Sequence, residues 1–224
     1  MRTRGVRPSD LAGKAGEIAG VLEHRLVSGK YRFGETLSIY TLAEQFDASR
    51  QPVAAAVVYL RSIGYLEVIP QVGCRVVSPS AQEVIDFYRM YSKVESVISG
   101  LAAQRHEGNE AAQLVDLAER LAASPFQTDQ ERWTYGEGVT EFHKLTGAMA
   151  RSVTLVGRIS SLRRISRFYL WQGKSVRNPD PDTTEYMNRS RLQIAHAIAE
   201  RDSDAAERLT EDHIRANPGW VGIV

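Results

Sequence analysis

Residues 48–77 read ASRQPVAAAVVYLRSIGYLEVIPQVGCRVV, and this stretch decides the fold of the chain. Ser49 is a residue type that caps helices, and Pro52 is tolerated in a first helical turn. Apolar residues then recur at helical spacing and predict one buried stripe, formed by Val53, Val57, Leu60 and Ile63. We therefore expect a helix that starts near Arg50 and is capped by Ser49.

A hairpin is expected directly after this helix. Gly64 stops the helix, and two short β-rich runs follow at residues 66–69 and 74–77. Residues 70–73, Pro-Gln-Val-Gly, lie between the runs and have the composition of a turn.

The residues before position 48 supply two more helices. A first helix is expected over roughly residues 11–28, because its apolar residues share one face: Ile18, Val21, Leu22 and Leu26. Gly29 ends it, and Ser38 can cap a short second helix that buries Leu42 and Phe46. Three helices and a hairpin predict a winged helix-turn-helix over residues 1–79, the fold that places a helix N-terminus in a DNA major groove.

The outer face of the third helix has the chemistry of a DNA-reading surface. Arg50 can reach guanine or a phosphate, Gln51 can read adenine, and the small Ala54 lets the backbone approach the base edges. Arg61 lies on the same face, and Arg75 on the wing suits a phosphate contact. The alternative is that these elements are packed helices and a hairpin with no nucleic-acid role.

The N-terminal part resembles the GntR family of bacterial transcription regulators. The matching residues are Leu37-x4-Leu42-Ala43, Ser49-Arg50-x-Pro52-Val53, Leu60-x3-Gly64-Tyr65-Leu66 and Gly73-x2-Val76. The family usually has an arginine that helps to read DNA where this chain has Ala54. The resemblance implies that Gln51 and Arg61 share that work, or that fewer polar contacts read the operator. The predicted DNA-contacting residues are Ser49, Arg50, Gln51, Ala54, Arg61, Gly73 and Arg75.

Composition limits the class of protein. The 224 residues suffice for one large or two small domains, and 43% of them are hydrophobic. No apolar run is long enough to span a bilayer, and the basic N-terminus lacks the apolar core of a signal peptide. The single Cys74 excludes an internal disulfide and a multi-cysteine zinc site, so a cytoplasmic location without membrane contact is expected.

Charge differs between the two parts of the chain. Residues 1–79 carry 10 Lys and Arg against 7 Asp and Glu, whereas the remainder carries 18 against 20. A mildly basic domain joined to a mildly acidic one suits DNA binding combined with a separate regulatory body.

Residues 80–224 show helical periodicity and predict an all-α antiparallel bundle of about six helices. The expected ranges are roughly 81–105, 110–122, 129–149, a helix after Ser152, 184–200 and a helix after Ser203 that ends at Pro218-Gly219. Polar residues interrupt the apolar stripes of these helices: Tyr91, Glu95, His143, Arg191 and His213. Ligand sites in bundles are built from such inward-facing side chains, so these five residues are the predicted effector site.

Arg191 decides between two interpretations of this site. An arginine in a buried stripe needs a partner. That partner is either Glu95, which makes the pair structural, or an anionic ligand that the guanidinium binds in bidentate fashion.

The C-terminal part resembles the ligand-binding domain of FadR-type GntR regulators. The matching segments are Glu95-x5-Leu101-Ala-Ala103, Phe142-His143 and Ala197-Ile-x3-Asp202-x3-Ala206-x6-His213. In most such domains one aspartate and three histidines hold a divalent metal that helps to bind a carboxylate. The matching positions here are Val139, His143, Arg191 and His213. Valine cannot coordinate a metal and arginine is a permanent cation, so we expect no metal or other cofactor.

The sequence thus predicts a homodimeric transcription regulator that reads a pseudo-palindromic double-stranded operator, since a two-fold protein reads a two-fold site. A small acidic metabolite is expected to bind the bundle and to relieve repression. One alternative is a dimeric DNA-binding scaffold without an effector. The other is an enzyme acting on a small carboxylate, against which we find no Gly-x-Ser-x-Gly, phosphate-binding glycine loop or His-Glu-x-x-His.

Overall fold

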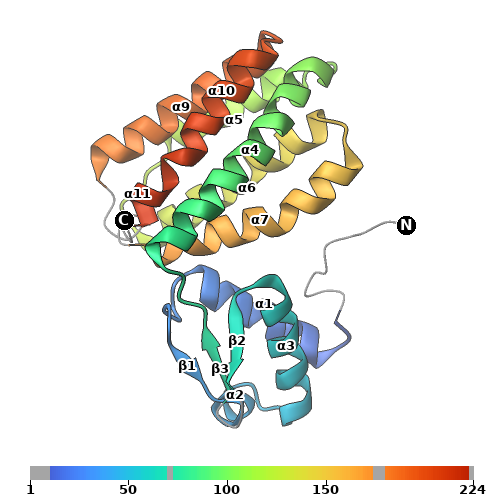
Figure 1. Cartoon of the computed structure of the whole chain (residues 1–224), viewed down its shortest axis with the longest axis vertical. Helices are drawn as coiled ribbons and strands as arrows, with labels where there is room; N and C mark the ends of the chain where they lie inside the picture. The colour runs from blue at the N-terminus through green and yellow to red at the C-terminus, as the bar shows by residue number, and fades with distance from the viewer. Residues whose placement is uncertain (1–10, 70–72, 174–179, 222–224) are drawn as a thin grey trace. The chain divides into compact units, whose positions relative to one another are not determined.

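The computed structural model describes residues 11–69, 73–173 and 180–221 (Figure 1). The chain divides into two compact units. The first contains Met1–Ser80 together with Ser160–Gln172, and the second contains Ala81–Ile159 together with Gly173–Val224.

The first unit has the predicted winged helix-turn-helix architecture. Its helices are α1 (Lys14–Val27), α2 (Ile39–Gln45) and α3 (Arg50–Ile63), and Gly64 ends α3 with a left-handed backbone at φ 95°. The strands β2 (Leu66–Ile69) and β3 (Gly73–Val76) form the antiparallel wing. The predicted turn at Pro70–Gly73 lies mostly outside the described residues.

A third strand, which the sequence does not predict, joins the wing. Strand β1 (Thr36–Leu37) pairs antiparallel with β3, so the sheet has the order β1-β3-β2. It has two residues, too few for the alternation of apolar and polar residues that reveals a strand in a sequence. The core beneath the sheet and helices is formed by most of the predicted stripe residues, including Ile18, Leu22, Leu26, Val53, Val57 and Leu60. Val21 was predicted on the buried face of the first helix but is 42% exposed, so that part of the prediction is wrong.

The second half of a later helix completes this unit. Helix α7 spans Val153–Gln172, and its residues from Ser160 onward belong to the first unit. Phe168 is fully buried there, with its ring 4.9 Å from that of Tyr65. The Gln172 amide donates to the carbonyl oxygens of Leu26 (3.1 Å) and Tyr31 (2.8 Å). Periodicity predicts α7 as a helix but does not indicate which unit its second half joins.

The second unit is the predicted helical bundle (Figure 1). Besides the start of α7 it contains the following helices: α4 (Ala81–Arg105), α5 (Glu110–Ala123), α6 (Asp129–Met149), α9 (Pro181–Ala199), α10 (Ser203–Arg215) and α11 (Asn217–Val221). Helix α10 packs along α4 and α9, and α5 packs against α6 and α9. The apolar core includes Leu114, Leu117, Leu121, Phe142, Ile194 and Ile198.

Two helix ends in the bundle differ from the prediction. Helix α9 starts at Pro181, three residues before the expected start, because the Asp180 carboxylate accepts a hydrogen bond from the Thr183 N–H (3.0 Å) and caps the helix. Pro218 and Gly219 lie within the short α11 and do not end the helical region. Proline is tolerated there because it occupies a first helical turn.

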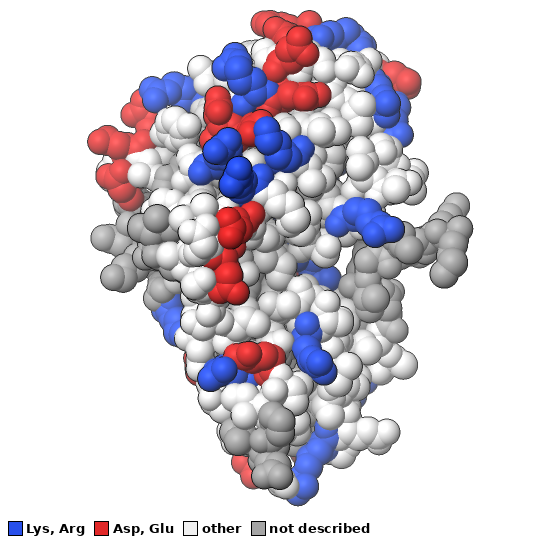
Figure 2. Space-filling model, in the orientation of Figure 1, with Lys and Arg blue, Asp and Glu red and all other residues white. Residues whose placement is uncertain are grey.

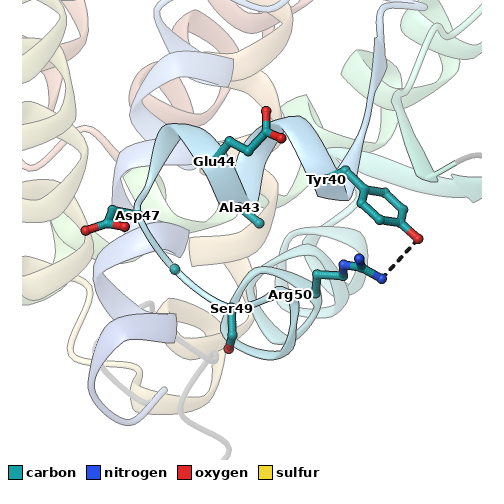
Figure 3. A pocket seen from close by; sticks show the side chains of 7 residues that line it. Tyr40, Ala43, Glu44, Asp47, Ser49 and Arg50 are labelled. Atoms are coloured by element: carbon teal, nitrogen blue, oxygen red, sulfur yellow. Dashed lines mark hydrogen bonds between the residues drawn. The ribbon is translucent and has the colours of Figure 1, made fainter.

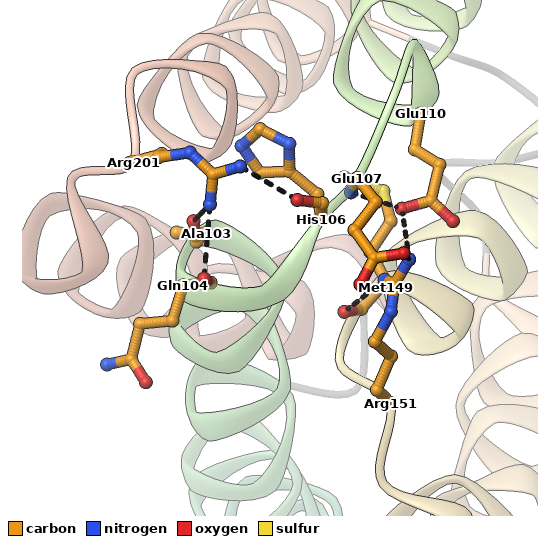
Figure 4. A network of polar contacts seen from close by, with 8 residues as sticks. All are labelled: Ala103, Gln104, His106, Glu107, Glu110, Met149, Arg151 and Arg201. Atoms are coloured by element: carbon orange, nitrogen blue, oxygen red, sulfur yellow. Dashed lines mark hydrogen bonds and ion pairs between the residues drawn. The ribbon is translucent and has the colours of Figure 1, made fainter.

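Arg151 and Arg201 form a network of polar contacts at one end of the bundle (Figure 4). The Arg201 guanidinium donates to the carbonyl oxygens of Gln104 (3.1 Å) and His106 (2.8 Å) at the end of α4. Arg151 forms ion pairs with Glu107 (3.1 Å) and Glu110 (3.0 Å). The Arg201 contacts satisfy carbonyl groups that a helix end leaves without partners.

Within the described residues, no helix is both long and apolar enough to cross a membrane.

Candidate functional sites

Helix α3 buries one face and exposes the other, as predicted. Arg50, Gln51 and Arg61 are exposed, and Ala54 is partly buried. Val58 lies on the same side and is 60% exposed. A single exposed apolar side chain is ordinary in itself, and Val58 lies on the helix face that also carries Arg50, Gln51 and Arg61.

The start of α3 differs from the prediction in one contact. Ser49 occupies the N-cap position, but its side chain makes no capping hydrogen bond, so the prediction that its hydroxyl caps the helix is wrong. Ser38 does cap α2, where its hydroxyl accepts from the Thr41 N–H (3.4 Å). Because the Ser49 side chain does not occupy the first-turn N–H groups of α3, it leaves them able to donate to a phosphate at the positive end of the helix dipole.

A tyrosine that the sequence analysis did not select holds Arg50. Helices α2 and α3 border an open surface hollow of about 730 Å³, lined by Tyr40, Ala43, Glu44, Asp47, Ala48, Ser49 and Arg50 (Figure 3). Arg50 Nη1 donates to Tyr40 Oη at 3.0 Å, and the guanidinium carbon lies 3.8 Å from the centre of the Tyr40 ring. The available signal in the sequence is an aromatic residue on the polar side of the short second helix.

The wing residues have structural partners. Arg75 on β3 pairs across the sheet with Glu67 on β2 at 2.6 Å, and each side chain is 46% exposed. Gly73 has a φ of 143°, and a Cβ there would lie 2.6 Å from the Leu37 carbonyl oxygen of β1. Glycine at this position is therefore required by the close approach of β1.

The face of the molecule drawn in Figure 2 mixes Lys and Arg with Asp and Glu. This face therefore shows no broad basic surface, and the candidate DNA interface consists of particular residues of α2 and α3.

The polar residues predicted in the bundle form two groups. In the first, the buried Tyr91 donates its hydroxyl to Glu95 Oε1 at 2.7 Å. His143 Nδ1 lies 3.6 Å from the same carboxylate oxygen. Helices α4 and α6 thus bring Tyr91, Glu95 and His143 together.

The second group is centred on Arg191. Only 2% of it is exposed, and its Nη1 donates to Tyr135 Oη (2.8 Å) and to Asn188 Oδ1 (3.2 Å). Both partners are neutral, and over the described ranges no carboxylate oxygen lies within ion-pair distance of Arg191. Glu95 is therefore not its ion-pair partner. Tyr135 and Asn188 are not among the residues predicted from the sequence, although Asn188 precedes Arg191 by one helical turn.

His213 also lies close to this group. Its Nδ1 is 2.6 Å from Ser190 Oγ. Burial lowers the pKa of His213 well below its usual value, and the nearby charges of Arg191 and His143 lower it further. The ring is therefore neutral at physiological pH, and Arg191 supplies the positive charge of this group.

The side chains at the positions of the family's metal ligands do not fit a divalent metal. Val139 packs with the apolar core and Arg191 is a hydrogen-bond donor. Across the part of the chain that the structure describes, no three His, Cys, Asp or Glu side chains are grouped in a way that could hold an ion. Two neutral imidazoles make a poor site for a hard cation.

Comparison with protein families matches both parts of the chain. Residues 14–76 match the bacterial regulatory proteins of the gntR family, and residues 86–216 match the FCD domain. The chain is a GntR-family transcription regulator with an FCD domain. GntR regulators bind DNA operators.

Relatives and solved structures agree with this assignment. The HTH-type transcriptional repressor RspR of Escherichia coli K12 is 26% identical over 202 residues, which cover 89% of this chain and 85% of that protein. The solved structure of E. coli McbR/YncC has a TM-score of 0.76 at 18% identity, with 95% of this chain and 98% of that one covered. A putative GntR regulator from Rhodococcus sp. RHA1 has a TM-score of 0.72 at 18% identity, with 94% and 98% covered. These similarities between structures support the fold.

Proposed function

We propose that this GntR regulator is a cytoplasmic repressor that binds a pseudo-palindromic operator as a homodimer and is released by a small carboxylate. Residues 1–79 carry the DNA contacts, and residues 80–224 carry effector binding and dimerisation. The observation that carries the proposal is Arg191, a buried arginine of the FCD domain for which the described residues offer no anionic partner, in a chain whose helix α3 also exposes one polar face.

On the DNA side, Arg50 and Gln51 read base edges near the start of α3 while Ala54 and Val58 allow close approach and contact thymine methyl groups. Arg61, Arg75, Ser49 and the backbone near Gly73 contact phosphates and sugars, which position the protein without specifying sequence. Arg75 forms a surface ion pair with Glu67, and such pairs contribute about 0–1 kcal/mol to stability. Arg75 can therefore leave Glu67 and bind a phosphate at little cost in free energy.

On the effector side, Arg191 carries a full charge that burial disfavours and that neutral partners only partly offset. A guanidinium has five N–H donors in a planar fork and binds carboxylates in bidentate fashion. Tyr91, Glu95, His143 and His213 form the remainder of the site and select the rest of the ligand. Arg191 replaces the metal of related domains as the source of positive charge.

Release requires that the acid bind the DNA-free arrangement better than the DNA-bound one, because a ligand with equal affinity for both shifts nothing.

The direct test is gel retardation with DNA fragments from around the coding gene, at stated salt because phosphate contacts make binding salt-dependent. We expect a specific complex, and Arg50→Ala should weaken it roughly tenfold or more, since one bidentate base contact is worth that much. Arg120→Ala is the matched control, because Arg120 is exposed on α5 and pairs with Asp116 at the surface. Equal affinity of wild type and Arg50→Ala contradicts the assignment of Arg50.

A further inference from the structure

The pairing of Arg50 with Tyr40 has a functional consequence that rests on the proposed DNA-binding role. Glu44 and Asp47 line the same hollow, yet neither forms an ion pair with Arg50 among the described residues. Figure 3 shows both carboxylates directed away from the guanidinium, which lies against the tyrosine. Arg50 is therefore held by a neutral side chain, and its charge is not cancelled by an acidic one.

We propose that Tyr40 is a positioning and specificity-determining residue of the DNA interface. Its ring and hydroxyl hold the Arg50 guanidinium in one orientation toward the base edges. The tyrosine O–H hydrogen is not consumed by this contact, because Tyr40 Oη accepts from Arg50 Nη1. It is available to donate to a phosphate of the same duplex.

The physical basis is the entropy of the arginine side chain. A free arginine side chain loses rotamer freedom when one geometry is imposed on it. Stacking on Tyr40 imposes that geometry before DNA arrives, so less freedom is lost on binding. Only one N–H is occupied by Tyr40, and the remaining donors can still form the bidentate contact with guanine.

Tyr40 also meets the geometric requirement for this role. It is the second residue of α2, whose start is fixed by the Ser38 cap, and α2 packs against α3. The side chain is 59% exposed, so the fold does not depend on burying it. A substitution at position 40 therefore tests binding with little effect on stability.

The experiment is a double-mutant cycle of operator affinity with wild type, Tyr40→Ala, Arg50→Ala and the double variant. Tyr40→Ala should weaken specific binding about 3- to 10-fold, and Tyr40→Phe should lie between it and wild type, because it keeps the stack and loses the hydroxyl. In the Arg50→Ala background the Tyr40→Ala change should cost clearly less, since its target is absent. Tyr186→Ala, an exposed tyrosine on α9, is the matched control.

The outcomes separate this inference from the proposed function. If wild type retards no fragment, the DNA-binding role itself fails. If wild type binds and Tyr40→Ala binds equally well or more tightly, or if the cost of Tyr40→Ala is the same with and without Arg50, then the positioning role is wrong. Melting temperatures of all variants, expected to be within about 2 °C of wild type, show whether a loss of binding reflects unfolding.

Discussion

Two arginines, one in each unit, differ in the partners that the fold gives them. Arg164 on α7 lies in the first unit and forms an ion pair with Glu23 of α1 at 2.6 Å. It also donates to Tyr59 Oη at 2.8 Å, and its carbonyl oxygen accepts from the Tyr65 hydroxyl at 3.2 Å. Arg191 in the second unit is more deeply buried and has two neutral partners.

The pKa of Arg164 reflects its partners. Burial alone lowers it, but the charge of Glu23 and the contacts with Tyr65 and Tyr59 together raise it above its usual value. The fold thus supplies the counter-charge that Arg164 needs. For Arg191 the described residues supply none, so its charge is available to a ligand. Under the proposed function, the partner and not the depth of burial distinguishes a structural arginine from a ligand-binding one.

Removing the ion pair between Arg164 and Glu23 should have the largest effect on the free energy of unfolding. Glu23→Ala leaves the Arg164 guanidinium without its carboxylate, and we expect a loss of roughly 2–3 kcal/mol, below the value for a fully buried pair because both side chains are partly exposed. Urea denaturation measures it, with Glu185→Ala as the control because the pair of Glu185 with Arg189 lies at the surface. Equal stability of the two variants contradicts a structural role for Arg164.

Acid should weaken the second unit through His213. Because the folded-state pKa of His213 is lowered, the unfolded chain binds a proton more readily once the pH falls below about 6.5, and stability then falls with pH. The loss of unfolding free energy caused by His213 is negligible well above pH 6.5 and reaches about 1.4 kcal/mol one pH unit below it. His213→Gln should therefore lose less stability than wild type between pH 7.5 and 5.5. Parallel losses in wild type and variant mean that His213 is not held neutral.

The sequence predicted the elements that local patterns encode. The stripe of α3, the glycine at its end and the two longer strands of the wing were found because helical and strand periodicities are local. The inward position of Arg191 followed from the same periodicity, since it shares a stripe with Ile194 and Ile198.

Contacts between distant residues were not predictable in this way. The Gln172 amide donates hydrogen bonds to the carbonyl groups of Leu26 and Tyr31, which precede it by more than 140 residues. No local sequence pattern indicates these contacts. Periodicity states that a face is buried but not what covers it. Tyr40 and Tyr135 are not predictable from the sequence for the same reason. Each of them contacts an arginine that lies in another helix.

The most direct test of the account is the release of the operator complex by small carboxylic acids, compared between wild type and Arg191→Met. We predict that at least one acid raises the melting temperature of wild type and dissociates its operator complex, because a ligand that binds the native form stabilises it. Arg191→Met should fold with a stability within about 1 kcal/mol of wild type and should bind the operator. The acid should neither raise its melting temperature nor dissociate its operator complex. An Arg191→Met protein that is still released by the same acid, or one that unfolds like Glu23→Ala, contradicts the assignment of Arg191 as the ligand-binding arginine.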